Sequence, residues 1–456
     1  MQKSSTVKLL YFLTLFAIFS LSINSTRAQV WTQLGTGTNS TVNALIVYNS
    51  ELIAAGNFST AGGQNVNHIA RWNGTGWQPL GLGTNDDIYA LSIYNSYLVV
   101  GGKFTSAGGV AANHIALWNG SLWTTLGNGF DGNVYALVVH LNQLYAAGAF
   151  TNSGSTLLNK IGRWSGASWV AVGLGFDNDV NALVSFNSDL YAGGIFLNSG
   201  GTSLKRIALW NGTLWFPLGL GLDDGGVYAL RIYGSSVAVG GTFTTIGGST
   251  VNRIARWNGA SWATLGSGFN NGVYSLYSSG SILYAGGTFD NADFLPASRV
   301  AVYNGSGWMA MGTGLGGSSA NGKAITAYGG RTVFAGTFST AGGSPANNIS
   351  GWGAPLGIKP IDITIPEKFS LGQNYPNPFN PSTKIRFGVP AINGAQDVKI
   401  ILYDVAGKEI IAIVNEKLAS GVYEAEFNAG TLPSGTYFYK LVSTGFTQTK
   451  RMIILK

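Results

Sequence analysis

The stretch Asn67–Gly81, NHIARWNGTGWQPLG, decides the fold because it places two tryptophans on either side of an Asn-Gly turn signal. Nearly the same sequence recurs as NHIALWNGSLWTTLG at Asn113–Gly127 and as NRIARWNGASWATLG at Asn252–Gly266. Asn-Gly pairs favour tight β-hairpins, and aromatic residues are enriched in strands. Each copy is therefore predicted to form a hairpin with its two tryptophans on adjacent strands.

A Gly-x-Phe element measures the period of this repeat. Its glycines are Gly56, Gly102, Gly148, Gly194, Gly241, Gly287 and Gly336, with spacings of 46, 46, 46, 47, 46 and 49 residues. Each unit holds four short strand patterns, which in the first unit are VNALIVY from Val42, ELIAAGNF from Glu51, HIARW from His68 and WQPLG from Trp77. Four strands leave little room for a helix, so the sequence predicts an all-β fold.

The ends of the array distinguish a closed ring of blades from an open solenoid, the two ways in which such units can stack. A fourth-strand segment, WTQLG at Trp31–Gly35, precedes the first complete unit, whereas the last unit stops after its third strand near Trp352. An open solenoid would leave both ends exposed as sheet edges. We therefore predict a seven-bladed β-propeller closed by the N-terminal strand.

The repeated tryptophans have two interpretations: packing between blades, or an aromatic platform for sugars. Their recurrence in almost every unit favours packing, because each blade of a ring has the same packing problem. The pattern LVVGGKF followed by IALWNGSLW resembles kelch repeats, although the Asn-Gly turn and the Gly-x-Phe ending depart from them. The resemblance implies a similar blade arrangement and no particular kelch partner.

Composition narrows the classes of function. The chain has 456 residues, 67 of them glycine, and no cysteine, which excludes disulfides, thiolate metal sites and cysteine nucleophiles. The net charge of the whole chain is +7, but residues 29–356 are nearly neutral, with 12 basic and 11 acidic side chains. A nucleic-acid partner needs a clustered basic face and is not expected.

The first 28 residues have the pattern of a cleaved secretory signal. Lys3 and Lys8 precede an apolar run from Leu9 to Leu21, and a small-residue site ends at Ala28. The alternative, a membrane anchor, is less favoured because the run is shorter than the ~20 residues that cross a bilayer. The sequence thus predicts a signal peptide at 1–28, the propeller at 29–353 and no transmembrane segment after cleavage.

After Trp352 the repeat stops, and residues 354–365 are predicted to be a linker in which Pro355 and Pro360 block regular strand pairing. Residues 366–456 then alternate apolar and polar positions between Gly, Pro and Asn turns. This pattern predicts a second, smaller domain, an Ig-like β-sandwich.

Separated motifs in residues 366–456 closely resemble the type A C-terminal sorting domain of the type IX secretion system. The matching residues include Asn374, Pro376, Asn377, Pro378, Phe379, Asn380 and Pro381 of NYPNPFNP, Gly435 and Tyr437 of PSGTYFY, and Lys450 near the end. The resemblance implies the type IX secretion machinery as a partner, in a Gram-negative bacterium of the Bacteroidetes/Chlorobi type. It also implies that the product is secreted or held on the outer cell surface.

Few residues qualify for catalysis. No zinc-protease, nucleophile-elbow or phosphate-loop motif occurs, and the histidines are His68, His114 and His140. His68 and His114 occupy equivalent repeat positions, which favours a structural turn contact over metal or acid–base work.

The loops between fourth and first strands carry the most interesting polar set. Its carboxylates, taken as candidate ligand-binding residues, are Asp87, Asp131, Asp177, Asp179, Asp223 and Asp224. In a ring these loops share one face, where carboxylates can meet Ca²⁺ or sugar hydroxyls. The alternative is that Asp, Asn and Gly occur there because turns need them. Two carboxylates roughly 5–10 Å apart would also serve glycoside hydrolysis.

These observations favour an exported, non-enzymatic, monomeric propeller that binds an extracellular glycan, polymer or protein without a cofactor, Ca²⁺ being the one ion considered. The alternative is a secreted carbohydrate-active hydrolase or lyase that uses the loop aspartates.

Overall fold

The structure is a computed structural model that describes residues 30–74, 76–353, 358–362, 365–392, 396–418, 420–429 and 432–455. The predicted signal peptide and much of the predicted linker lie outside these ranges. Within them every regular element is a β-strand, which confirms the all-β prediction. No helix long and apolar enough to cross a membrane occurs in these ranges.

Seven four-stranded antiparallel sheets are built from the described residues between 30 and 353, one for each repeat. Sheet 1 contains β2 (Val42–Tyr48), β3 (Glu51–Gly56), β6 (Ile69–Trp72) and β7 (Trp77–Pro79). Sheet 2 contains β8 (Ile88–Tyr94), β9 (Tyr97–Gly102), β12 (Ile115–Trp118) and β13 (Trp123–Thr125). Sheet 3 contains β14 (Val134–His140), β15 (Gln143–Gly148), β18 (Ile161–Trp164) and β19 (Trp169–Ala171).

The remaining four sheets repeat this plan. Sheet 4 contains β20 (Val180–Phe186), β21 (Asp189–Gly194), β24 (Ile207–Trp210) and β25 (Trp215–Pro217). Sheet 5 contains β26 (Val227–Tyr233), β27 (Ser236–Gly241), β30 (Ile254–Trp257) and β31 (Trp262–Thr264). Sheet 6 contains β32 (Val273–Ser279), β33 (Ile282–Gly287), β36 (Val300–Tyr303) and β37 (Trp308–Ala310). Sheet 7 contains β39 (Asn321–Tyr328), β40 (Arg331–Thr337), β43 (Ile349–Gly353) and β1 (Val30–Gln33).

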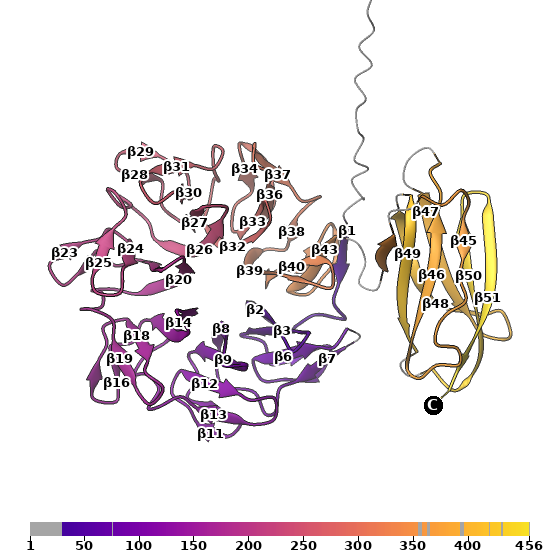
Figure 1. The fold of residues 1–456 in the computed structure, drawn as a ribbon, viewed down its shortest axis with the longest axis horizontal. Coiled ribbons are helices and arrows are strands. Elements are labelled where there is room, and N and C mark those ends of the chain that lie inside the picture. The colour runs from indigo at the N-terminus through magenta and orange to yellow at the C-terminus, as the bar shows by residue number, and fades with distance from the viewer. Residues whose placement is uncertain are drawn as a thin grey trace, which may run out of the picture.

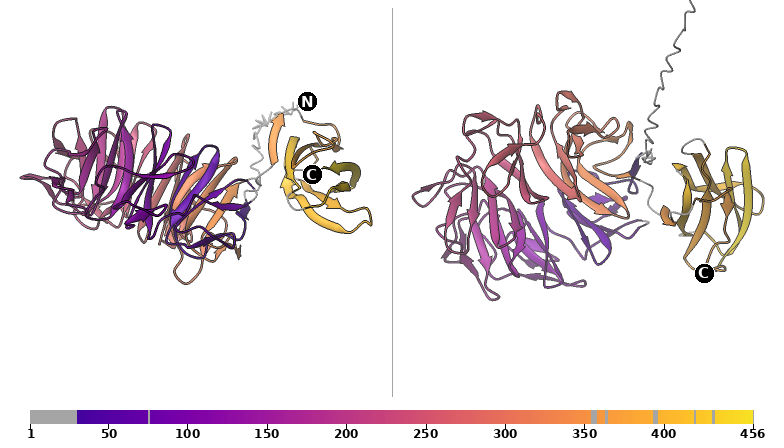
Figure 2. Two further views of the ribbon diagram at one scale, coloured as in Figure 1. Left: turned by 90° about the horizontal axis from the view of Figure 1, so that it is seen from below. Right: turned by 45° about the horizontal axis from the view of Figure 1, so that its top comes forward.

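The sheets follow one another around a central axis (Figures 1 and 2). The first strand of each sheet contacts the first strand of the next, from β2 through β8, β14, β20, β26 and β32 to β39. Strand β39 in turn contacts β2. This array of small antiparallel sheets is consistent with a β-propeller.

Strand β1 is the predicted closing strand, and it pairs with β43 at the other end of the array. Trp31 lies opposite Trp352, and Thr32 lies opposite Gly351. The ring of Trp31 packs at 5.0 Å from that of Trp352 and at 5.4 Å from that of Phe334, measured between centroids. In Figure 1 the indigo β1 accordingly lies beside the orange β43.

The tryptophan hairpins join the third and fourth strands, as the sequence predicts. In sheet 2 Trp118 lies opposite Trp123, with ring centroids 5.2 Å apart. The connection has four residues, longer than the tight Asn-Gly hairpin expected. Asn119 Oδ1 accepts hydrogen bonds from the backbone N–H groups of Ser121 (2.9 Å) and Leu122 (2.8 Å), so the asparagine side chain shapes the turn.

The second tryptophan of each hairpin ties its sheet to the preceding one. Its indole N–H donates to the carbonyl of the residue that follows the preceding fourth strand, as Trp169 does to Leu126 at 3.0 Å. The other donors are Trp77 to Leu34, Trp123 to Leu80, Trp215 to Val172, Trp262 to Leu218 and Trp308 to Leu265, at 2.8–3.0 Å. Trp31 completes the set by donating to Met311 at 3.0 Å.

The Gly-x-Phe element has a steric cause, which Gly148 illustrates. The first strand has a β-bulge between Val134 and Ala136, and a Cβ atom on Gly148 would lie 2.0 Å from the carbonyl oxygen of Asn133. Only glycine tolerates so close an approach of backbone. Two residues later, Phe150 is fully buried between sheets.

Short outer hairpins follow each Gly-x-Phe element, and the sequence analysis did not anticipate them. Two-residue strands form them, namely β4 (Thr60–Ala61), β5 (Gln64–Asn65), β10 (Ser106–Ala107), β11 (Val110–Ala111), β16 (Asn152–Ser153), β17 (Thr156–Leu157), β22 (Asn198–Ser199), β23 (Thr202–Ser203), β28 (Thr245–Ile246), β29 (Ser249–Thr250), β34 (Asn291–Ala292), β35 (Leu295–Pro296), β41 (Thr340–Ala341) and β42 (Ser344–Pro345). The last of these hairpins is joined by β38 (Leu315–Gly316).

The C-terminal region forms two four-stranded antiparallel sheets around one apolar core. One has the order β44 (Ile358–Asp362), β49 (Gly421–Asn428), β46 (Ser382–Val389) and β45 (Ser370–Leu371). The other has the order β48 (Glu409–Leu418), β47 (Gln396–Tyr403), β50 (Gly435–Ser443) and β51 (Phe446–Ile454).

The expectation of an unpaired linker at 354–365 is wrong for Ile358–Asp362, which pairs with β49. Proline is tolerated in edge strands and at bulges, where no ladder hydrogen bond requires its N–H. Strand β44 is at the edge of its sheet, and its register shifts between Pro360 and Asp362. The C-terminal sheets therefore begin earlier than the predicted boundary at residue 366.

The indole hydrogen bonds predict unequal effects of two similar substitutions. Trp169→Phe removes the donor to Leu126, and a buried carbonyl left unpaired costs about 1–3 kcal/mol. Trp72→Phe is the matched control, because the buried Trp72 Nε1 has no hydrogen-bond partner among the described residues. Chemical denaturation should show Trp169→Phe to be the more destabilising by about that amount. Equal losses of unfolding free energy would contradict this role of the indole.

Candidate functional site

Six Asp and Asn side chains hold the loops at one end of the sheets. Asp131 Oδ1 accepts hydrogen bonds from the backbone N–H groups of Thr151 (2.7 Å) and Asn152 (2.9 Å), which follow the next Gly-x-Phe element. Equivalent bonds are made by Asp177, Asp224, Asn39, Asn85 and Asn270. Three of the six predicted ligand-binding carboxylates, Asp131, Asp177 and Asp224, therefore stabilise the loops by accepting backbone hydrogen bonds.

These hydrogen bonds also set the ionisation of three carboxyl groups. Burial by itself raises the pKa of Asp131, Asp177 and Asp224, but the donors around each carboxylate outweigh burial and hold the pKa below the ordinary value of 3.8. A carboxylate that accepts several hydrogen bonds is stabilised in its charged form. At neutral pH all three are thus firmly ionised.

The other three predicted residues lie in the same loops with different partners. Asp87 directly precedes β8, accepts a hydrogen bond from Asn57, and lies 3.7 Å from His68 Nδ1. Asp179 directly precedes β20, with Lys160 Nζ at 4.0 Å.

Asp223 Oδ2 accepts a hydrogen bond from the backbone N–H of Gly248 at 2.8 Å, and its Oδ1 lies 3.9 Å from Lys205 Nζ. The six predicted aspartates are therefore each engaged within the loops. In the described ranges no group of three or more His, Asp or Glu side chains is placed to hold a metal ion.

The histidines make local contacts. His68 and His114 each place Nδ1 against the carbonyl of the Gly-x-Phe glycine, Gly56 at 3.2 Å and Gly102 at 3.1 Å. His140 is buried, pairs through Nδ1 with Ser185 Oγ at 2.9 Å, and has its pKa lowered by burial.

A polar groove opens where sheet 7 meets sheet 1, with a volume of about 540 Å³. Hydroxyl and amide side chains line it, including Ser318, Ser319, Ser339 and Asn347. Here the loop between fourth and first strands departs from the repeat, because Leu315–Gly316 form a strand in place of the Asp or Asn anchor. The groove thus arises where the repeat symmetry is broken.

A second cavity, of about 240 Å³, lies among the first strands at the central axis. Small residues in the third position of these strands, such as Ala90, leave it open. The residue directly before this small residue is Tyr89, Tyr135, Tyr228 or Tyr274 in four of the strands and Lys323 in β39. The sequence analysis above does not predict this set, although Tyr, Asn and Lys all occur at this one position of the repeat in the sequence.

The sorting motif occupies the loop between β45 and β46. Asn374 is buried, and its Nδ2 donates to Thr383 Oγ1 at 3.0 Å. Asn377 Oδ1 accepts from the backbone N–H of Ile453 at 2.9 Å, and the buried Phe379 forms a bridge with Ile454. Asn377 and Phe379 thus connect the loop to the last strand, β51, whereas Asn374 connects it to β46.

Other motif residues stay at the surface or support the second sheet. Pro376, Pro378, Asn380 and Pro381 are exposed. Gly435 starts β50, Tyr437 donates to the carbonyl of Pro433 at 3.1 Å, and Lys450 lies opposite Tyr439.

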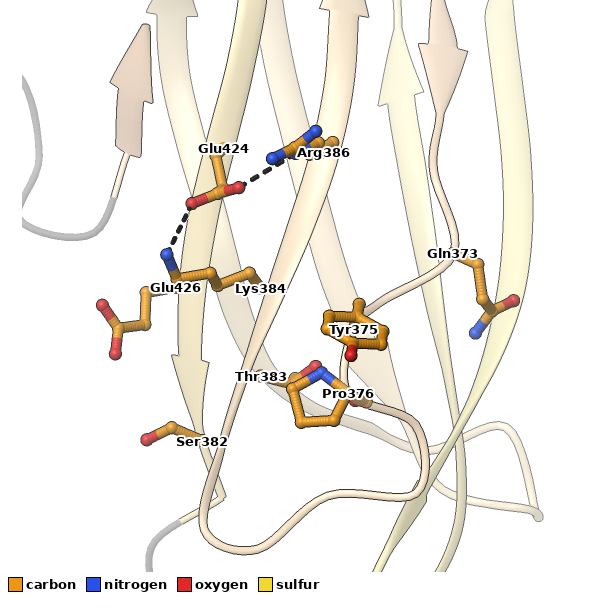
Figure 3. Close-up of a pocket in the computed structure, with 9 residues that line it drawn as sticks. All are labelled: Gln373, Tyr375, Pro376, Ser382, Thr383, Lys384, Arg386, Glu424 and Glu426. Atoms are coloured by element: carbon orange, nitrogen blue, oxygen red, sulfur yellow. Dashed lines mark hydrogen bonds and ion pairs between the residues drawn. The ribbon is translucent and has the colours of Figure 1, made fainter. Parts of the chain in front are cut away.

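A charged groove of about 630 Å³ lies beside this loop (Figure 3). Glu424 accepts hydrogen bonds from Lys384 and Arg386, each at 3.0 Å, and Tyr375 is 80% exposed at one end. Burial raises the pKa of Glu424, but its two cationic partners lower the pKa by more, so this carboxylate remains charged. The groove thus combines fixed charges with an exposed aromatic ring.

Two family models match segments of the chain. Residues 373–455 match the secretion system C-terminal sorting domain. Residues 236–259, from β27 to just beyond β30, match a domain of unknown function (DUF5122) beta-propeller. The chain therefore carries a β-propeller and a type IX sorting tail. No curated protein matches it.

Such a tail marks a protein that the type IX secretion system delivers to the cell surface or extracellular space of a Gram-negative bacterium. The predicted handling by this machinery and the predicted localisation are thereby confirmed. The kelch-like character of the repeat stays a prediction.

The carboxylate anchors predict a specific acid sensitivity. Because the folded-state pKa values of Asp131, Asp177 and Asp224 are lowered, their contribution to stability is present above the unfolded pKa of about 3.9 and is lost as the pH falls through the folded values. Replacing all three with Asn keeps the backbone hydrogen bonds, as Asn39, Asn85 and Asn270 show.

Thermal denaturation between about pH 6 and pH 2.5 should therefore show a smaller loss of Tm in the Asp131→Asn, Asp177→Asn, Asp224→Asn variant than in the wild type. Parallel curves over that range would contradict the proposed role of the carboxylates.

Proposed function

We propose that residues 29–353 form a closed seven-bladed β-propeller, which follows a cleaved signal peptide at 1–28. Seven repeat sheets, the contact of β39 with β2 and the pairing of β1 with β43 support the closed ring. We further propose that the sorting tail is an Ig-like β-sandwich, supported by its two four-stranded antiparallel sheets and shared core.

We propose that the exported propeller is a non-enzymatic module that binds an extracellular glycan. The groove between sheets 7 and 1 carries this proposal. It offers about 540 Å³, and the hydroxyl and amide groups that line it can each donate and accept hydrogen bonds, as sugar hydroxyls require. Ser318 and Ser319 are exposed and so accessible to a polymer.

The alternative function, glycoside hydrolysis by loop aspartates, is less well supported. A glycosidase needs one carboxylic acid whose pKa is raised so that it can donate a proton. Asp131, Asp177 and Asp224 have the opposite property, since hydrogen bonds lower the pKa of each. Their uniform structural role in successive loops further favours binding over catalysis.

A glycan array probed with the mature chain tests the binding proposal. Ser318→Trp should abolish the signal of each bound glycan, because the large ring fills the groove. Ser155→Trp is the matched control, since Ser155 is an exposed serine in the outer hairpin of sheet 3. An array without any bound glycan, or equal binding by both variants, would refute the proposal.

Export can be tested separately in a host that has type IX secretion. Removing residues 366–456 should leave the remaining chain in the periplasm, whereas the full chain reaches the surface or medium. Immunoblots of cell fractions measure the difference. Unchanged export of the truncated chain would contradict the role of the tail.

A further inference from the structure

The central cavity is chemically distinct from the groove on the loop face. The first strand is the inner edge strand of its sheet, so its unpaired backbone N–H and C=O groups are directed toward the axis. These groups need hydrogen-bonding partners inside the cavity. A ligand with several hydroxyl groups can supply them, whereas an apolar ligand cannot.

Four tyrosines line this cavity, and their rings form two adjacent pairs. The rings of Tyr89 and Tyr135 are 5.6 Å apart, and those of Tyr228 and Tyr274 are 5.2 Å apart. All four are half-buried, so that they present ring surface and remain accessible. Burial and Asp87 raise the pKa of Tyr89 to about 12, and its phenol donates to Asp87 Oδ2 at 3.4 Å, so Tyr89 offers the cavity its ring surface.

The same position holds different residues in the other three sheets. Asn43 and Asn181 turn their amides to the following sheet, where they donate to the carbonyls of Ile88 (3.0 Å) and Val227 (3.2 Å). Lys323 remains as the one charged side chain that lines the cavity in the described part of the chain. Its ammonium donates a single long hydrogen bond, 3.4 Å to Asn43 Oδ1, and no ion pair to it is found among the described residues.

Burial lowers the pKa of Lys323 by more than the charge of Asp87 raises that pKa. Asp87 is outside the cavity lining, and it is engaged by Asn57, by Tyr89 Oη at 3.4 Å and by His68 at 3.7 Å. Burial lowers the pKa of Lys323, so the ammonium would gain from an anionic partner. One cation without a lining anion favours a ligand with one negative charge and no positive charge.

We propose that this cavity binds a monocarboxylated, polyhydroxylated sugar, that is, a hexuronate. Lys323 pairs with its carboxylate, and the four tyrosines pack on its ring. The phenols of Tyr135, Tyr228 and Tyr274 donate to its hydroxyls, and the inner strand edges complete the hydrogen bonds. A volume of about 240 Å³ is below the roughly 300–1,000 Å³ of pockets for drug-sized ligands, so one sugar ring is the expected occupant.

Isothermal titration calorimetry of the mature full-length chain with D-glucuronate and D-galacturonate tests this site. Both should bind, and D-glucose and D-galactose should bind at least about tenfold more weakly, because a charged hydrogen-bonded pair is lost. The ligand could be a free sugar or the end of a polymer, and a galacturonate trisaccharide represents the polymer end. Tight binding of the monosaccharide or of the trisaccharide supports the site.

Lys323→Met should weaken uronate binding by about tenfold or more. Lys323→Tyr should do the same and is expected to fold, because four other sheets carry tyrosine at this position. Lys103→Met is the matched control: Lys103 is an exposed lysine that pairs with Asp86 at 3.1 Å. Thermal denaturation confirms that each variant is folded.

Absence of uronate binding, equal affinity for neutral hexoses, or full affinity in both folded Lys323 variants would overturn the proposal. The result is independent of the loop-face groove, since Ser318→Trp leaves the axial cavity intact. Failure of one site is thereby distinguishable from failure of the other.

Discussion

The hydrogen bond from the fourth-strand indole to the preceding sheet is the interaction on which the rest of the structure depends. A four-stranded sheet of about 46 residues cannot bury both faces alone, so its stability comes from its neighbours. The tryptophan supplies apolar area and a directed N–H at the same contact. Because Trp31 makes this bond to Met311, the contact between the last repeat and its neighbour is of the same kind as the others.

Two further repeated devices hold the loops that surround the axis. The Gly-x-Phe glycine lets the bulged first strand approach the second, and the phenylalanine fills the space between sheets. In six of the loops an Asp or Asn side chain then accepts hydrogen bonds from two backbone N–H groups, as Asp177 does from Leu197 and Asn198. With the loops fixed in this way, variation in a few positions changes surface chemistry without altering the scaffold.

Much of this organisation could be predicted from sequence because it rests on repetition and on residues with narrow conformational roles. The spacing of the glycines gave the number of units, and the unmatched WTQLG segment indicated its pairing with β43. The two-residue outer hairpins were missed because their ladders are too short to produce an alternating pattern. Strand β44 was missed because Pro360 argues against pairing, and only its edge position makes pairing acceptable.

The candidate sites were less accessible to sequence reasoning. The clustered aspartates predicted a ligand site in the loops. In the structure, Asp131 and Asp224 instead accept hydrogen bonds from backbone N–H groups about 20 positions further along the chain. Conversely, Lys323 and the tyrosines of the axial cavity are spread over five sheets. Their proximity depends on ring geometry, which no local pattern encodes.

Closure through β1 is the central claim, and hydrogen–deuterium exchange of the mature chain tests it most directly. If β1 is an integral edge strand of sheet 7, the amides of Trp31–Leu34 that hydrogen-bond to β43 should exchange much more slowly than those of an unstructured peptide. Exchange of Trp31–Leu34 at the rate of an unstructured peptide, while β43 remains protected, would contradict closure.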